Sequence, residues 1–67
     1  MANFISGLMI EHAELNSKID KLSKFILSSK YNELELVDRA DLQEQLEVMN
    51  TYAEILLRRT ARLCNNV

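Results

Sequence analysis

The stretch YAEILLRRTAR, residues 52–62, combines an aromatic side chain with closely spaced guanidinium groups. Tyr52 is followed by Arg58, Arg59 and Arg62, in a chain whose formal net charge is −2. An aromatic ring can stack on a nucleobase, and a guanidinium group can hold a phosphate through two parallel hydrogen bonds. These residue types therefore suit a nucleotide or a similar phosphorylated ligand. A purely structural alternative is that the arginines form ordinary ion pairs and complement the negative end of a helix dipole.

Two apolar stripes with helical spacing would position these side chains. The first stripe comprises Ile5, Leu8, His12, Leu15, Ile19, Leu22 and Ile26. The second comprises Leu42, Leu46, Met49, Ala53, Leu56, Thr60 and Leu63. Serine and asparagine in SSKYN, residues 28–32, compete with helical hydrogen bonding. We therefore predict an all-α fold with one domain over residues 1–67. It is an antiparallel two-helix hairpin, with a helix over about 3–28, a loop over about 29–35 and a helix over about 36–64.

The two stripes have matching length and spacing, so they align residue by residue when the hairpin closes. This alignment brings one side of each helix together and defines the candidate ligand site: Glu11, Lys18, Tyr52, Arg59 and Arg62. Within it we expect Glu11 to approach Arg59 and Lys18 to approach Tyr52. Arg58 points elsewhere on the second helix. We also expect His12, within the first stripe, to be buried and neutral and to face Leu56.

More large apolar side chains are present than one seam between two helices can cover. The surplus is Phe4, Met9, Ile10, Phe25, Val48, Tyr52, Ile55 and Leu57. Burying each large apolar side chain is worth roughly 1.5 to 3 kcal/mol, so a second hairpin is expected to cover them. The sequence therefore predicts a homo-oligomer, with a dimeric four-helix bundle as the smallest closed assembly.

Several classes of function find no support in the sequence. A carboxylate pair, a nucleophile with an orienting base and a glycine-rich phosphate loop are all missing, so we expect no enzyme activity. Cys64 is the single cysteine and His12 the single histidine, so we expect neither an internal disulfide nor a metal or cofactor. The acidic balance argues against DNA or RNA as partner. The N-terminal stretch MANFISGLMIEHAE resembles neither a signal peptide nor a membrane span, which favours an intracellular protein.

A family resemblance adds an expectation about function. EHAELNSKIDKLSKFI, residues 11–26, followed by Gln45, Met49, Tyr52, Leu56 and Arg59, resembles a family of very small bacteriophage and prophage proteins related to a crAss-like phage protein. The resemblance implies an accessory phage protein in the cytoplasm of the infected bacterial host. Small helical-hairpin phage oligomers include sponges that sequester nucleotide second messengers of bacterial immunity. We therefore expect a homo-oligomer that sequesters a small phosphorylated or cyclic nucleotide. The alternative is a protein-interaction module that binds and inhibits or redirects a host protein.

Overall fold

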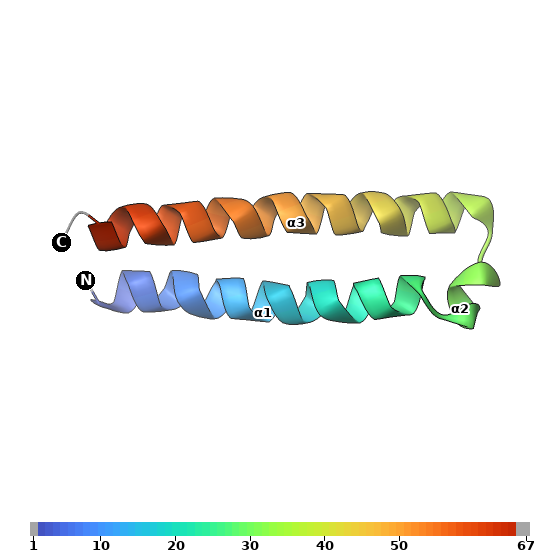
Figure 1. The fold of residues 1–67 in the computed structure, drawn as a ribbon, viewed down its shortest axis with the longest axis horizontal. Coiled ribbons are helices and arrows are strands. Elements are labelled where there is room, and N and C mark those ends of the chain that lie inside the picture. Colours follow the sequence, from blue (N-terminus) through green and yellow to red (C-terminus); the bar gives the residue numbers. More distant parts are fainter. Residues whose placement is uncertain (1, 66–67) are drawn as a thin grey trace.

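The chain folds into two long antiparallel helices joined by a short bend (Figure 1). The computed structural model describes the backbone of residues 2–65 and the side chains of residues 5–65. Helix α1 spans Ala2–Ile26, the one-turn helix α2 spans Ser29–Asn32, and α3 spans Leu36–Asn65. The molecule is a rod with principal extents of 49 × 15 × 13 Å. Over the described residues the fold is all-α, as predicted.

The bend differs from the predicted loop. Helix α1 ends at Ile26 because the backbone is diverted at Ser28, which is extended with φ −87° and ψ 161°. The Ser28 hydroxyl donates a hydrogen bond of 2.6 Å to the Phe25 carbonyl, and the Ser28 amide donates to the same oxygen at 2.9 Å. Local serine bonds of this kind replace the next helical turn. The chain then forms α2 within the segment that was expected to be a loop.

Tyr31 fastens α2 to both long helices. Its side chain is 7% exposed, and its ring meets Phe25 edge-on with centroids 6.3 Å apart. The Tyr31 hydroxyl donates to the Arg39 carbonyl at 3.0 Å and accepts a hydrogen bond from Gln43 Nε2 at 3.0 Å. The bend is therefore packed against the start of α3.

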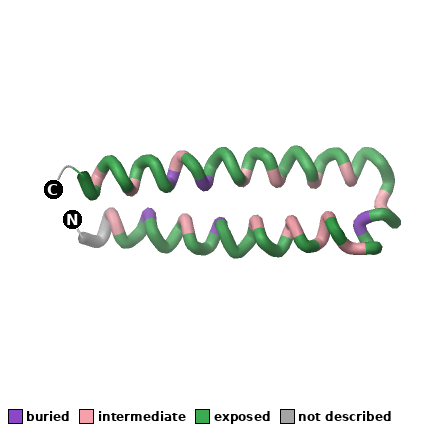
Figure 2. The backbone as a smooth tube through the Cα atoms, viewed as in Figure 1, coloured by how far each residue is buried: buried purple, intermediate pink, exposed green. Residues whose placement is uncertain are grey.

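The core lies in the seam between α1 and α3 (Figure 2). Its buried members are Leu8, Leu15, Ala53 and Leu56, with Ile19, Met49 and Leu63 packed against them. Leu56 is fully buried, at 0% exposure. The Thr60 hydroxyl, which interrupts the apolar stripe, donates to the Leu56 carbonyl at 2.8 Å. The predicted stripes are thus the faces that meet.

The expectation of a buried His12 was wrong. This side chain is partly exposed, and its Nδ1 atom lies 3.3 Å from Asn16 Nδ2. A seam between only two helices is narrow, so it encloses Leu56 and leaves the imidazole at its edge.

Much of the predicted apolar surplus is exposed. Met9, Ile10, Val48, Leu57 and Tyr52 are open to solvent, as are Leu27, Leu36 and Val37 near the bend. Phe25 and Ile55 are partly buried instead, Phe25 because Tyr31 covers it. Phe4 lies outside the residues whose side chains are described. Among the helices of the described region, none is both long enough and apolar enough to cross a membrane.

Candidate functional site

Tyr52 joins the two long helices on one side of the rod. Its hydroxyl donates a hydrogen bond to the Glu11 carboxylate. This bond raises the pKa of the Tyr52 hydroxyl above its ordinary value of 10.0; partial desolvation and the negative charge of Glu11 act in the same direction, whereas the charge of Arg59 opposes them. The ring itself remains 41% exposed. Glu11 therefore fixes one end of a ring whose surface is still accessible.

The structure gives Glu11 a partner other than the one expected within the candidate site. The Glu11 carboxylate accepts from Tyr52 rather than pairing with Arg59. Within residues 5–65 the one ion pair joins Lys24 Nζ and Asp20 Oδ2 at 2.9 Å, so Lys18 and Arg59 form no ion pair there. The expected approach of Lys18 to Tyr52 stays a prediction. Glu11 bonds to Tyr52 because the tyrosine side chain is long and extends along the seam. It therefore reaches the carboxylate that the alignment had placed next to Arg59.

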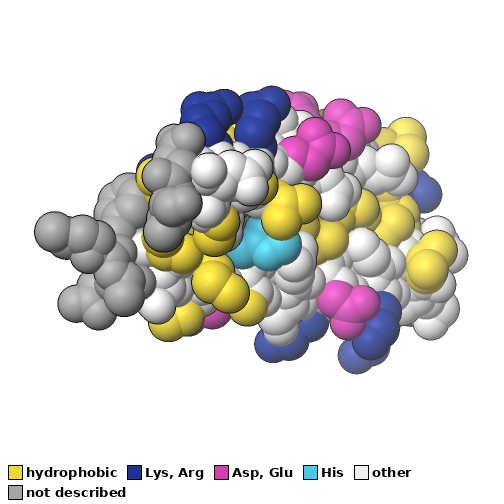
Figure 3. Space-filling view, turned by 60° about the vertical axis from the view of Figure 1, so that its left-hand side comes forward, with side chains coloured by type: hydrophobic (Ala, Val, Ile, Leu, Met, Phe, Trp, Pro, Cys, Tyr) yellow, Lys and Arg dark blue, Asp and Glu magenta, His cyan; other side chains and the backbone are white. Residues whose placement is uncertain are grey.

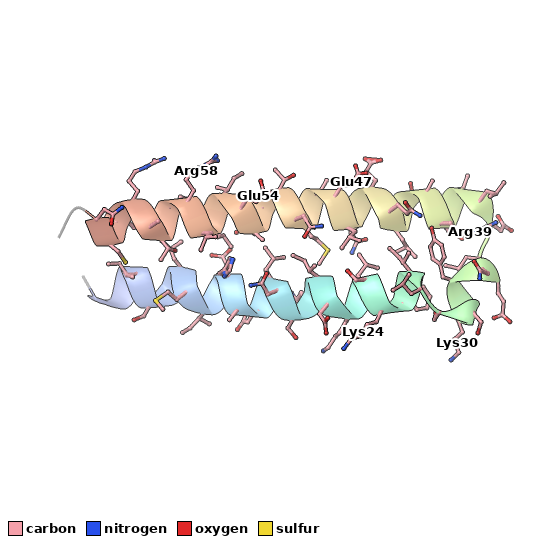
Figure 4. All side chains as sticks on the ribbon, viewed as in Figure 1. Lys24, Lys30, Arg39, Glu47, Glu54 and Arg58 are labelled. Carbon is pink, nitrogen blue, oxygen red and sulfur yellow. The ribbon has the colours of Figure 1, made fainter. Side chains whose placement is uncertain are left out.

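Arg59 and Arg62 are both exposed on α3. Arg59 follows Tyr52 by two helical turns and therefore lies on the same side of α3. Its positive charge lowers the pKa of the Tyr52 hydroxyl and so opposes the larger effect of Glu11. Arg58, by contrast, points away from α1, together with Glu47 and Glu54 (Figure 4). Arg58 and Arg59, although adjacent in sequence, thus lie on different sides of α3.

A shallow apolar hollow lies beside Tyr52. It has a volume of about 350 Å³ and is lined by Glu47, Val48, Thr51, Tyr52 and Ile55. Val48 on its wall is 62% exposed. The hollow offers apolar surface next to the exposed ring, and Arg59 lies one turn beyond Ile55 along α3.

A second hollow at the bend was not anticipated from the sequence. Its volume is about 830 Å³, and it is lined by Tyr31, Leu36, Arg39, Ala40, Gln43, Glu44 and Glu47. The Nε atom of Arg39 is buried and has no hydrogen-bond partner among the described residues. Two acidic residues, Glu44 and Glu47, line this hollow, whereas Glu47 is the one acidic residue that lines the hollow beside Tyr52, so the bend is less suited to an anion. The available sequence signal was a tyrosine inside the connecting segment, followed by the lone arginine of an acidic stretch.

Charged side chains of both signs share the surface near the chain ends (Figure 3). In that view basic side chains neighbour acidic ones along the upper edge, and the histidine is visible between apolar groups. Within the part of the chain that the structure describes, no three His, Cys, Asp or Glu side chains are grouped in a way that could hold a metal ion. The candidate site is therefore an aromatic ring with nearby cations and an apolar hollow.

Comparison with known proteins identifies the family. A model of the Sequestin family matches residues 2–62, which includes the whole of α1, the bend and most of α3. No curated protein and no solved structure matches the chain. Because the match spans the hairpin and every residue of the candidate site, the chain belongs to the Sequestin family.

Proposed function

We propose that this protein is a binding protein without enzyme activity, and that as a homo-oligomer it sequesters a small phosphorylated ligand of the nucleotide type. The name of the family, Sequestin, suggests a protein that sequesters a molecule, which supports the proposal. The ligand is held and later released unchanged, since nothing in the proposed mechanism makes or breaks a covalent bond. In this proposal the protein is an accessory protein of a phage and acts in the cytoplasm of the infected bacterial host. Its ligand there is a nucleotide signal of the host's immunity.

The observation that carries the proposal is the state of Tyr52. Its hydroxyl is bound by Glu11 while the ring remains 41% exposed beside an apolar hollow. A ring held at one end loses little further freedom when a base stacks on it. Stacking of a base on an aromatic side chain contributes about 1 to 3 kcal/mol. Tyr52 is therefore a suitable platform for a nucleobase.

The cations around this platform supply the complementary charge. Arg59 can hold a phosphate through two hydrogen bonds, and Arg62, one turn further, adds a second guanidinium. Lys18 on α1 contributes a point charge to the same side. In the proposed site Glu11 positions the ring through the Tyr52 hydroxyl, and its carboxylate can also accept a hydrogen bond from a ribose hydroxyl.

The test compares two adjacent arginines. Arg59→Ala removes a charge-assisted contact worth roughly 1.5 to 3 kcal/mol, so we expect affinity to fall about ten- to a hundred-fold. Arg58→Ala removes the same charge from a side chain that points away from α1 and should change affinity far less. Calorimetric titration of parent and variants with cyclic nucleotides and ADP-ribose derivatives measures this. Ligand recovered intact after heat denaturation would support sequestration without turnover. Equal affinities in all three proteins would remove the site from this side of the rod.

A second candidate function is binding of a host protein through exposed apolar side chains. Met9 and Leu57, each 58% exposed, favour it. Leu57 lies about 140° round α3 from Tyr52, outside the ligand site. Leu57→Ser should abolish association with a host protein and leave nucleotide binding unchanged.

A further inference from the structure

The charges along one side of α3 change sign from one end to the other. The residues recur every three or four positions: Asp41, Glu44, Val48, Tyr52, Ile55, Arg59 and Arg62. The N-terminal pair is acidic, the three central residues are apolar or aromatic, and the C-terminal pair is basic. All are exposed except Ile55, which is partly buried. We call this row the α3 stripe.

The neighbouring side of α1 repeats the pattern. Glu11 and Glu14 are followed by Lys18 and Lys21 with the same helical spacing, and all four are exposed. The hydrogen bond between Tyr52 and Glu11 places this α1 stripe beside the α3 stripe. The two stripes therefore form one continuous surface of the hairpin.

These charged side chains are not neutralised by ion pairs inside the described chain. The ion pair found within residues 5–65 joins Asp20 and Lys24, which belong to neither stripe. At the same time Val48 and Tyr52, at the centre of the α3 stripe, are 62% and 41% exposed. This surface has an exposed apolar centre, an acidic end and a basic end. It is therefore complementary to a copy of itself that runs in the opposite direction.

We infer that this surface packs against a second copy of the chain, turned end for end about a two-fold axis perpendicular to the helices. On α3, Asp41 then opposes Arg62 of the second copy, and Glu44 opposes its Arg59. In the centre Val48 opposes Ile55 of the second copy, so apolar side chains meet. On α1, Glu11 opposes Lys21 of the second copy and Glu14 opposes its Lys18. Every residue pair occurs twice, as a two-fold interface requires.

A single two-fold axis generates both the α3 pairs and the α1 pairs, although the pairs on each helix were matched separately. The α3 pairs are centred between Thr51 and Tyr52, and the α1 pairs are centred on Asn16. The alignment of the two apolar stripes sets Leu15 level with Ala53 and Ile19 level with Met49, and all four belong to the one core cluster of the hairpin. This register places Asn16 level with Tyr52. The two centres therefore coincide along the rod.

The sign pattern excludes a parallel second copy. Laid side by side in the same direction, the α3 stripes would oppose acids to acids and arginines to arginines, which is unfavourable. The antiparallel arrangement brings opposite charges together at both ends. It also covers the apolar centre. The occupant that fits this surface is consequently a second copy of the same chain.

This inference rests on the self-association included in the proposed function and adds its geometry. It brings the two copies of Tyr52 close to the axis and places Glu44 of one chain beside Arg59 of the other. The second copy thereby lies against the residues of the proposed ligand site. Tests of the interface can nevertheless be made without any ligand.

Charge reversal tests the pairing. Glu44→Arg and Arg59→Glu each oppose like charges at two places in the dimer, so the dissociation constant measured by sedimentation should rise at least about tenfold. The double variant exchanges the two charges and should restore dimerisation. Glu54→Arg and Arg58→Glu are matched controls, because both side chains point away from α1. The inference is overturned if the double variant dimerises no better than the single variants.

Disulfide trapping tests the direction and leaves all charges in place. Chains with Val48→Cys and chains with Ile55→Cys, each with Cys64→Ser, should cross-link when mixed. Neither should cross-link alone, because cysteines whose Cα atoms are more than about 7 Å apart cannot be bridged. Cross-linking of each variant to itself would show a parallel arrangement, and no covalent product in any mixture would remove the interface.

Nucleotide titration separates the two proposals. Cross-linking between positions 48 and 55 in a protein that binds no nucleotide would support the interface and refute the proposed ligand. Nucleotide binding by a protein that fails to cross-link would refute the interface and leave the ligand proposal standing.

Discussion

At the scale of single residues, helical spacing places a side chain on a face but leaves its partner open. Glu11, Tyr52 and Arg59 were correctly assigned to one side of the hairpin, yet Glu11 was paired with Arg59. In the structure the Glu11 carboxylate accepts a hydrogen bond from the Tyr52 hydroxyl instead. Heptad arithmetic compares Cα levels, whereas a tyrosine hydroxyl lies more than a helical turn from its own backbone. The contact between Glu11 and Tyr52 therefore depends on the direction in which the tyrosine side chain extends along the seam. Helical spacing in the sequence does not give that direction.

The Tyr52 hydroxyl provides a pH-dependent prediction. Its pKa is raised above 10.0, chiefly by the hydrogen bond to the Glu11 carboxylate. A pKa raised in the folded state means that folding favours the protonated phenol. The contribution to stability is therefore fully present below pH 10 and is lost as the pH rises through the folded pKa. Glu11→Gln should bring the pKa of Tyr52 back toward 10.0, as followed by its Cζ chemical shift during titration. An unchanged titration midpoint would contradict the role of Glu11.

At the scale of elements, the two long helices were predictable and the bend was not. Both apolar stripes span many turns, so their periodicity identifies α1 and α3 and the faces that meet. Helix α2 has one turn, which is too short to show a period, and Ser28 ends α1 through a local hydrogen bond to Phe25. The larger hollow beside Arg39 depends on this bend. It could not be located before the position of Tyr31 was known.

Tyr31→Phe tests how firmly α2 is fastened to α3. The substitution keeps the ring but removes the donor to the Arg39 carbonyl and the acceptor for Gln43 Nε2. Leaving part-buried polar groups unsatisfied costs about 1 to 3 kcal/mol, so the urea midpoint should fall accordingly. Tyr52→Phe is the matched control, because its hydroxyl is exposed and water can replace the lost bond. Equal destabilisation by the two substitutions would show that the Tyr31 hydroxyl does not secure the bend.

At the scale of the whole molecule, the hairpin encloses few residues for its length. The rod measures 49 × 15 × 13 Å, and four side chains form its buried core cluster. Small domains bury a limited share of their surface and usually need reinforcement. The sequence predicted the surplus of apolar side chains from their number alone, and Met9, Ile10 and Val48 are indeed exposed. The pairing inferred for the second copy depends on which sides of α1 and α3 are adjacent; the alignment of the stripes had assigned these sides, and the bond between Glu11 and Tyr52 agrees with that assignment.

The inferred self-association predicts that the thermal stability depends on protein concentration. If a second copy binds the folded chain and not the unfolded one, the midpoint of thermal unfolding should rise as concentration increases. Val48→Glu introduces a charge at the apolar centre of the α3 stripe and should lower the midpoint and abolish its concentration dependence. Asn50→Glu introduces the same charge on an exposed part of α3 outside the stripe and should retain that dependence. Circular dichroism melts over a dilution series measure both effects. A parent midpoint that stays constant across the series would mean that the hairpin is stable as a monomer, and its exposed apolar side chains would then have to be explained by a different partner.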